Sequence, residues 1–384
     1  MGLLSHLKYA KFSKRILSNK GKTPLYLIFF VTSKCNLKCA HCFYWKGLNQ
    51  IKDDLTLEEI SRIAENMDPL MLLRLTGGEP TLRKDLADIV KIFYNKNGVR
   101  NIGINTNGFL TQKIVSDINK ILKECKDIIL EVCVSLDDSE IQHDENRGVS
   151  TSYKKAVETI KSLKEIKKEY KNLRLAVTIT VTNKNQDRLD EIFEKDFLPL
   201  GPDFISVNLV RGLPKDPKLK DVNLEKYIKF INKIRSYNNR KSHELYINSS
   251  LKDKLMSKYI VNSIEQKKFQ GMYCLAGDKV GVIYSNGDVF PCELLNKQIG
   301  NIKEHNYNFK ELWNSEKGKH VRRFIKVTQC FCTHECFLTA NLLLNPRNLV
   351  RYIKEYIFSM IRSPDVTKKK SEIEHPAKLK AGVN

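Results

Sequence analysis

Residues 24–42, PLYLIFFVTSKCNLKCAHC, join an apolar run to three cysteines, Cys35, Cys39 and Cys42. The run has the length of a buried strand, and the cysteine loop follows its carboxyl end, where parallel sheets bind ligands. A closed zinc site uses four ligands, usually as two close pairs. Gaps of three and two residues on one tight loop instead suit the corners of a cubane iron–sulfur cluster. Three protein ligands would leave one iron open, as a catalytic metal site keeps a position for substrate.

Apolar strands and amphipathic helical patterns alternate along the first half of the chain. After the first run, the strand candidates are MLLRLTG (71–77), NIGINT (101–106), IILEVCVSL (128–136), LRLAVTITV (173–181) and FISVNLV (204–210). The helical patterns between them cover residues 56–66, 84–96, 110–124 and 151–170. This alternation predicts a parallel sheet covered by helices. Six such units are too few to close an eight-stranded barrel.

Composition limits the class of protein. A chain of 384 residues that is 41% hydrophobic can bury a large core, and we expect one large domain with a smaller one. No apolar stretch approaches the roughly 20 residues of a membrane span, and the N-terminus lacks the features of a signal peptide. The ten cysteines are therefore expected in the reducing cytoplasm, where clustered thiols bind metal. The net charge of +22 favours anionic partners or solvated lysine faces, and no aromatic-interleaved basic strip indicates nucleic acid.

A second cysteine region follows a Lys-rich stretch over residues 213–270. Its first part, Cys274, Gly287 and Cys292, has the spacing C-x12-G-x4-C, and GVIYSNGDVFPCEL (281–294) predicts a hairpin that turns at Asn286-Gly287. The second part has the spacing C-x-C-x3-C and contains Cys330, Cys332 and Cys336.

The first cysteine loop resembles that of the radical S-adenosylmethionine (SAM) superfamily, whose C-x3-C-x2-C motif follows the first strand of a partial (β/α)6 barrel. The resemblance covers roughly residues 24–212, and other segments match in order: GGEP (77–80), NTNG (105–108), SLD (135–137) and HDENRG (143–148). The resemblance implies an α/β fold, a partial (β/α)6 TIM-like barrel followed by a small cysteine-rich domain of a β-hairpin and a helix.

The family's chemistry implies roles for these segments. The cluster bound by the three cysteines passes one electron to SAM, and the resulting 5′-deoxyadenosyl radical abstracts hydrogen from a substrate. Flavodoxin or ferredoxin is the expected reductant. The GGEP segment, Gly77, Gly78, Glu79 and Pro80, would receive the methionine amino group of SAM. Arg147 could clamp the SAM carboxylate. The other expected SAM contacts are His41, Asn105, Ser135 and Asp137.

The second cysteine region resembles the opening of the SPASM extension, in which a hairpin delivers a cysteine to an auxiliary [4Fe–4S] cluster. The later cysteines depart from that pattern and support one cluster with one spare thiol, as in the shorter Twitch form. We expect Cys274 and Cys292 as ligands, completed by Cys336 with either Cys330 or Cys332, which are an awkward simultaneous pair. Zinc held by three cysteines and His334 is the alternative.

Glu293 directly follows Cys292, at the place where peptide-oxidising members of the family carry an acidic proton acceptor. A carboxylate beside a buried cluster could have a raised pKa and accept a proton from the substrate. The alternative is an exposed glutamate without a role.

The termini bear on the substrate. Residues 349–362 place apolar side chains on one face of a helix, and residues 1–23 are also basic and amphipathic. Such helices either lie peripherally at an anionic membrane or cap the barrel. The expected divisions are a barrel over 24–212, a helical connector over 213–270, a cluster domain over 271–340, an amphipathic helix over 341–362 and a disordered basic tail over 363–384.

Three functions remain open at this stage. The favoured one is a radical SAM oxidoreductase or maturase that acts on a peptide or protein. The second is a modifier of a lipid- or sugar-linked substrate at the membrane face. The third, a non-enzymatic iron–sulfur or zinc module that senses redox state, would not need the GGEP and RG segments.

Overall fold

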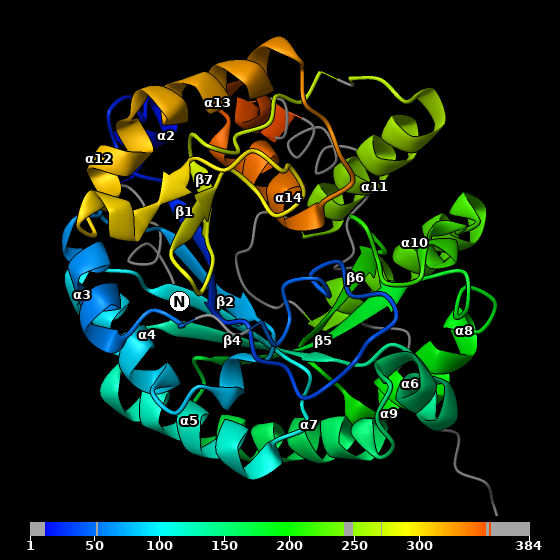
Figure 1. Ribbon diagram of the computed structural model, residues 1–384. Coiled ribbons are helices and arrows are strands. Elements are labelled where there is room, and N and C mark those ends of the chain that lie inside the picture. The colour runs from blue at the N-terminus through cyan, green and yellow to red at the C-terminus, as the bar shows by residue number, and fades with distance from the viewer. Residues whose placement is uncertain (1–11, 51–52, 242–248, 270, 351–352, 355–384) are drawn as a thin grey trace, which may run out of the picture.

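The computed structural model describes residues 12–50, 53–241, 249–269, 271–350 and 353–354. Within them, a curved sheet of nine strands has helices along its outer face (Figure 1). The strand order is β6-β5-β4-β3-β2-β1-β7-β8-β9, so the sheet does not close on itself. The predicted partial barrel is therefore confirmed.

The first six strands pair in parallel with their sequence neighbours. They are β1 (Tyr26–Thr32), β2 (Leu72–Gly77), β3 (Asn101–Thr106), β4 (Ile129–Ser135), β5 (Leu173–Val181) and β6 (Phe204–Leu209). Each overlaps one apolar segment that the sequence predicts as a strand. Every residue of β1 is buried, as expected for a strand with the barrel interior on one face and helices on the other.

Four predicted helices cover the outer face of the barrel (Figure 1). They are α3 (Leu57–Glu65), α4 (Leu86–Lys96), α5 (Thr111–Glu124) and α7 (Ser152–Glu169). The start of α3 has a capping box: the Thr56 hydroxyl accepts the Glu59 N–H, and the Glu59 carboxylate accepts the Thr56 N–H. Each helix returns the chain to the opposite edge of the sheet, so all six strands end at the same side.

Helix α6 (Glu140–Arg147) differs from the expectation, because the resemblance placed the HDENRG segment in a loop. Ser139 precedes the helix with extended backbone, and Gly148 ends it in the left-handed conformation with φ of 69°. Glycine adopts this conformation without steric cost, so the RG pair marks a helix end.

Short helical segments and a helical connector follow β5. They are α8 (Leu189–Ile192), the π-helical turn η2 (Phe193–Phe197), α9 (Leu198–Leu200), η3 (Pro217–Lys220), α10 (Leu224–Lys241) and α11 (Ser249–Gln266). Helices α10 and α11 occupy the range predicted as a helical connector. Another short segment, η1 (Pro80–Leu82), begins within the GGEP motif.

The second cysteine region extends the same sheet. Strand β7 (Val280–Ile283) pairs in parallel with β1, and β8 (Asp288–Phe290) and β9 (Gly300–Asn301) follow in antiparallel order. The predicted hairpin turn is present, with Gly287 at a φ of 93°. The remaining helices are η4 (Ile302–His305), α12 (Phe309–Asn314), α13 (Glu316–Val327) and α14 (Glu335–Leu344).

The barrel and the cysteine region share one apolar core. Phe29 of β1, Val282 of β7 and Trp313 of α12 belong to the same buried cluster. Trp313 lies so close to Gly281 that a Cβ there would be 2.7 Å from the ring. Helix α14 packs against α11, and both lie between β7 and β6 in Figure 1. These helices therefore cover the gap where the barrel sheet does not close.

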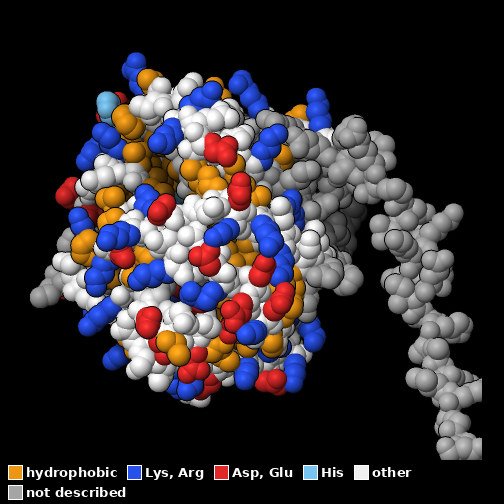
Figure 2. Space-filling view, turned by 90° about the vertical axis from the view of Figure 1, so that its right-hand side faces the viewer, with side chains coloured by type: hydrophobic (Ala, Val, Ile, Leu, Met, Phe, Trp, Pro, Cys, Tyr) orange, Lys and Arg blue, Asp and Glu red, His pale blue; other side chains and the backbone are white. Residues whose placement is uncertain are grey.

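The positive charge is spread over the surface. Figure 2 shows Lys and Arg side chains scattered over one face among Asp and Glu. Many are paired, as Lys120 is with Asp88 at 2.7 Å. Exposed pairs of this kind stabilise the fold little. On this face, the charge is better described as separate lysines exposed to solvent than as one concentrated surface for binding an anion.

Parts of the two predicted terminal amphipathic segments lie outside the described residues, as does the predicted tail over 363–384. They are residues 1–11 of the first segment and residues 351–352 and 355–362 of the second, and the structure describes residues 12–23 of the first, which contain α2 (Ser13–Leu17). Residues 346–350 are helical, and Val350 is 53% exposed. No helix among the described residues is long and apolar enough to cross a membrane.

Candidate functional site

A cavity with room for about 210 Å³ of water lies at the carboxyl ends of the barrel strands. The predicted residues that line it are Cys35, Cys39, His41, Cys42, Gly77, Gly78, Glu79, Asn105, Ser135, Arg147 and Glu293. They come from loops far apart in the sequence and meet because parallel strands end at one edge of the sheet. Pro80 and Asp137 are buried nearby and do not line the cavity.

The first cysteine loop is held by the Asn49 side chain, which is hydrogen-bonded to the backbone of Cys35. The Cys35 N–H donates to the Asn49 side chain at 2.9 Å, and the Asn49 amide donates back to the Cys35 carbonyl at 3.2 Å. Burial raises the pKa of the Cys35 thiol to about 12 and that of Cys42 to about 11. Burial also raises the pKa of Cys39. Buried thiols of this kind become thiolates when a metal neutralises them.

The three cysteines of the first loop suit an iron–sulfur cluster rather than a single metal ion. Among the described residues, no three His, Cys, Asp or Glu side chains converge as a single metal ion requires. An iron–sulfur cluster differs because each thiolate binds a separate iron atom. Cys35, Cys39 and Cys42 line one wall of the cavity, so this residue set fits a cluster better than a lone ion.

The GGEP segment packs directly against the cysteine loop. The Gly78 N–H donates to the Thr32 carbonyl at 2.9 Å, and the Glu79 N–H donates to the Lys34 carbonyl at 2.8 Å. A Cβ on Gly78 would lie 2.1 Å from the Lys34 carbonyl oxygen, so only glycine fits there. Gly77 has a φ of 146°, which also favours glycine.

Glu79 lines the cavity and also connects the ends of two neighbouring strands. Its buried carboxylate accepts hydrogen bonds from the Thr81 and Thr106 hydroxyls at 2.7 and 2.8 Å and from the Asn107 N–H at 2.7 Å. Burial raises its pKa despite these donors. The carboxylate thus ties the end of β2 to the end of β3.

The end of helix α6 places Arg147 in the cavity wall. Its guanidinium lies 2.5 Å from an Asp137 oxygen and donates to the Cys39 sulfur at 3.7 Å. Burial pushes the pKa of Asp137 upward, but Arg147 and the other nearby groups, among them the Thr180 N–H, together outweigh it and lower the pKa to about 2. His41 is held by the Asn146 side chain at 2.9 Å.

Sequence reasoning missed other cavity residues, many of which alternate along the strands. They are Phe30, Leu37, Phe43, Tyr44, Leu48, Thr76, Thr106, Asn107, Cys133, Thr178, Thr180, Asn208, Leu209 and Arg211. Cys133 and Ser135 of β4 are two positions apart, as are Thr178 and Thr180 of β5. Side chains at such spacing point to the same face of a strand, so extending this pattern from Ser135 would have found Cys133.

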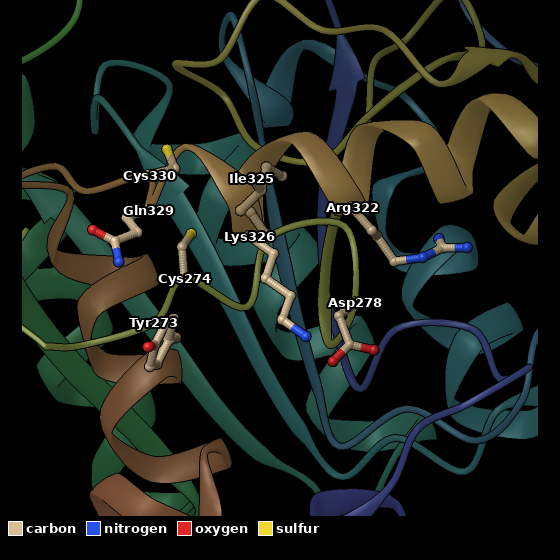
Figure 3. Close-up of a pocket in the computed structure, with 9 residues that line it drawn as sticks. Tyr273, Cys274, Asp278, Arg322, Ile325, Lys326, Gln329 and Cys330 are labelled. Carbon is tan, nitrogen blue, oxygen red and sulfur yellow. The ribbon is translucent and has the colours of Figure 1, made fainter.

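Four thiols of the second cysteine region gather at one place. Cys274 and Cys330 are hydrogen-bonded to each other, which lowers the pKa of Cys330 to about 7 and raises that of Cys274. Both line a pocket of about 280 Å³, and Figure 3 shows them at one end of it with Arg322 and Asp278 at the other. Cys292 and Cys332 lie within electrostatic range of Cys330, and burial raises their pKa values to about 12 and 11.

Cys336 has other partners, and the expected ligand pair of Cys336 with Cys330 or Cys332 stays a prediction. Cys336 is in the first turn of α14, hydrogen-bonded to His334 and near Arg211, and their effect outweighs burial to lower its pKa. Residues 330–334 form no helix or strand, whereas Cys336 is part of α14. His334 is hydrogen-bonded to Glu293, and zinc held by three cysteines and His334 stays the alternative prediction.

Glu293 reaches the cavity that contains the first cysteine loop. Its carboxylate is hydrogen-bonded to His334, and both side chains are buried. Burial pushes the pKa of Glu293 upward, but His334, Arg211 and Arg74 outweigh it and hold the pKa below its usual value. The expectation of a raised pKa is therefore wrong, and so is the alternative of an exposed glutamate.

Two family models match the chain. The radical SAM superfamily matches residues 29–195. This part of the chain is therefore a radical SAM domain. SPASM, an iron–sulfur cluster-binding domain, matches residues 274–337. This radical SAM protein therefore binds a [4Fe–4S] cluster with SAM and has a region for auxiliary iron–sulfur binding.

Similar proteins span most of the chain. An uncharacterized protein of Methanocaldococcus jannaschii is 28% identical over 305 residues, which are 78% of this chain and 96% of that protein. The antilisterial bacteriocin subtilosin biosynthesis protein AlbA of Bacillus subtilis is 26% identical over 296 residues. That match covers 76% of this chain and 60% of AlbA.

Solved structures share the fold at low identity. The structure of anSMEcpe with bound AdoMet and the Cp18Cys peptide is 20% identical, with a TM-score of 0.55 over 88% of this chain and 98% of that one. Streptococcus suis SuiB bound to the precursor peptide SuiA is also 20% identical, with a TM-score of 0.55 over 83% of this chain and 70% of SuiB. At this identity the likeness establishes the fold alone.

Proposed function

We propose that this radical SAM enzyme oxidises or otherwise modifies a peptide or protein substrate. Cys35, Cys39 and Cys42 would hold the cluster that binds SAM. The observation that carries the proposal is the position of Glu293, which belongs to the SPASM region and lines the same cavity as these cysteines. One cavity therefore combines the radical-forming residues with an acidic group suited to accept a proton.

When bound, the cluster and SAM supply a radical that removes a hydrogen atom from the substrate, and an auxiliary cluster can accept the remaining electron. The chain's own residues position the reactants. The backbone at Gly77 and Gly78 can approach the methionine amino group because no side chain is in the way. Asn105 and Ser135 present polar groups at strand ends in the same cavity. These contacts would hold SAM beside the cysteine loop.

Glu293 is suited to accept a proton from the substrate. Its lowered pKa keeps it ionised at neutral pH. The hydrogen bond from His334 fixes the orientation of the carboxylate. A carboxylate held this way can take the proton that an oxidised substrate carbon releases.

Relatives favour a peptide over other substrates. AlbA is named for the biosynthesis of subtilosin, a bacteriocin, and SuiB has been solved with a precursor peptide. The alternative substrate at a membrane depends on residues 349–362 and on the N-terminal segment over 1–23, both of which lie partly outside the described residues. No observation on the described residues favours it.

The test is anaerobic reconstitution followed by incubation with SAM, a reductant and short peptides encoded next to the gene. We expect 5′-deoxyadenosine formation to rise with one peptide, and mass spectrometry to show that this peptide has lost hydrogen. Unmodified peptides, together with modification of a membrane lipid or sugar fraction, would contradict the proposal. Protein that binds iron and leaves SAM intact would contradict the enzymatic assignment itself.

A further inference from the structure

The carboxyl end of helix α6 clamps the first cysteine loop at successive residues. The Lys38 N–H donates to the Arg147 carbonyl, and the Ala40 N–H donates to the Asn146 carbonyl, both at 2.9 Å. Gly148 closes this contact, since a Cβ there would lie 3.2 Å from the Lys38 side chain. The two segments are thus fixed relative to each other on both sides of Cys39.

The Arg147 guanidinium is committed within this clamp. One nitrogen donates to the Cys39 sulfur at 3.7 Å, and another lies 2.5 Å from an Asp137 oxygen. The Arg147 side chain is 7% exposed and the Asp137 side chain 1%. The second Asp137 oxygen accepts the Thr180 N–H at 2.9 Å, so the carboxylate that holds the guanidinium is itself fixed.

The charges around Cys39 leave Arg147 as the nearby permanent cation. His41 and His143 face the same group of side chains but carry no permanent charge. Asp137 is the compensating anion. As a thiolate, Cys39 would therefore carry its negative charge beside the Arg147 guanidinium, whose own carboxylate partner is Asp137.

We propose that Arg147 is a positioning residue that donates to the Cys39 thiolate and raises the reduction potential of the cluster, while Asp137 limits this effect. The inference rests on the proposed assignment of Cys39 as a cluster ligand. It differs from the role that the family resemblance implies, in which Arg147 clamps the SAM carboxylate. In this structure the guanidinium already has a sulfur and a carboxylate as partners.

The direction in which each residue shifts the reduction potential of the cluster follows from its charge. Reduction adds an electron to the cluster, so a cation near a cluster sulfur favours the reduced state. Hydrogen bonds to the sulfurs act in the same direction. Loss of Arg147 should lower the potential and make the cluster harder to reduce. Loss of the Asp137 charge should raise it.

The test is a redox titration of the holoenzyme followed by electron paramagnetic resonance in the absence of SAM. The spectrum of the Cys35, Cys39 and Cys42 triple alanine variant supplies the auxiliary signal to be subtracted. We expect Arg147→Gln to shift the reduction equilibrium about tenfold toward the oxidised state, which is about 59 mV for one electron. Asp137→Asn should shift it in the opposite direction, and the double variant should return close to the wild-type potential.

The neighbouring pair Asp138 and Arg188 provides a matched control. The two side chains lie 2.5 Å apart, as Asp137 and Arg147 do, but neither contacts a cysteine in the first loop. Asp138→Asn and Arg188→Gln should leave the potential unchanged. An equal shift in this pair would show that any buried charge change moves the potential, and it would overturn the inference.

Further outcomes separate this inference from the proposed function. If the Arg147→Gln variant does not retain the cluster, two other variants remain. Arg147→Lys keeps the positive charge, and Asp137→Asn still tests the sign of the shift in reduction potential. Full iron content with an unchanged potential would overturn the inference, and so would weakened SAM binding alone. If the triple cysteine variant retains the signal, the ligand assignment itself fails, and the proposed function fails with it.

Discussion

Glu293 in the wall of the cavity is hydrogen-bonded to His334, which follows it by 41 positions in the sequence. Glu293 follows the hairpin of β7 and β8, and His334 directly precedes α14. The pair therefore exists because α14 packs in the gap of the open barrel. The pair therefore connects the SPASM region with the cavity that contains the first cysteine loop. Replacing Glu293 tests the role of this carboxylate directly.

Glu293→Gln should separate SAM cleavage from substrate modification. Glutamine keeps the shape of the side chain but cannot accept a proton as a carboxylate does. We expect substrate modification to fall by about 10²- to 10⁴-fold, the range typical of general bases. SAM cleavage without substrate should continue. Glu304 is an exposed glutamate of the same region, and Glu304→Gln should leave both activities unchanged.

The triple variant of Cys35, Cys39 and Cys42 to alanine should lose SAM cleavage. Two [4Fe–4S] clusters would give about eight irons per chain, and the variant should retain about four. Iron analysis and 5′-deoxyadenosine detection check both statements. SAM cleavage at the wild-type rate would exclude these cysteines as the ligands of the catalytic cluster. About four irons and one zinc in the wild type would place zinc in the SPASM region.

Cys336→Ala should retain both clusters, whereas Cys332→Ala should lose the auxiliary one. The reason is position: Cys332 lies with Cys274, Cys292 and Cys330, and Cys336 lies with His334. We expect about eight irons in the first variant and about four in the second. The reverse result would mean that the cluster rearranges the start of α14 when it binds.

The barrel was largely predictable from sequence because its signals are local. Six apolar runs separated by helical patterns indicate a parallel sheet, and β1 to β6 follow them closely. Helix α6 was missed because HDENRG is short and polar, although Ser139 and Gly148 mark its two ends. The pairing of β7 with β1 carries no local signal, since it depends on the return of the chain after about 250 residues.

The site was predictable where residues follow strand ends. The cysteine loop and GGEP could be placed at one edge of the sheet because parallel strands end there together. The partners of Arg147 and Glu293 could not be predicted, because each is set by packing between distant segments. Spacing also could not show which side chains Cys336 contacts, since that depends on where α14 begins.

Gly78→Ala should damage both the fold and SAM binding. The added methyl would lie 2.1 Å from the Lys34 carbonyl, so the end of β2 and the cysteine loop must separate. Overpacking of this kind typically costs about 1–3 kcal/mol of unfolding free energy. Gly21→Ala is the control: it strains a positive φ but has no atom within 4 Å of its Cβ. Both variants should lose stability in urea unfolding, and Gly78→Ala alone should lose SAM affinity.

His143→Asn should reduce the loss of stability at mildly acid pH. Burial and the charge of Arg147 lower the pKa of His143 from 6.5 to about 3, and its Nδ1 accepts the Asp137 N–H at 3.1 Å. Below pH 6.5 the unfolded chain takes up a proton that the folded protein does not, so stability falls as the pH decreases toward 3. One unit below 6.5 this histidine should cost about 1.4 kcal/mol relative to pH 8.

Asparagine at position 143 can accept the same N–H through its side-chain oxygen but cannot titrate in this range. Anaerobic urea unfolding at pH 8 and pH 5.5 measures the effect, with the wild type and the variant compared at each pH so that the other titrating groups cancel. We expect similar stabilities at pH 8 and a variant that loses about 1.4 kcal/mol less than the wild type on going to pH 5.5. Equal losses in the two proteins would show that His143 can be protonated in the folded state, and its burial between Asp137 and Arg147 would then need another explanation.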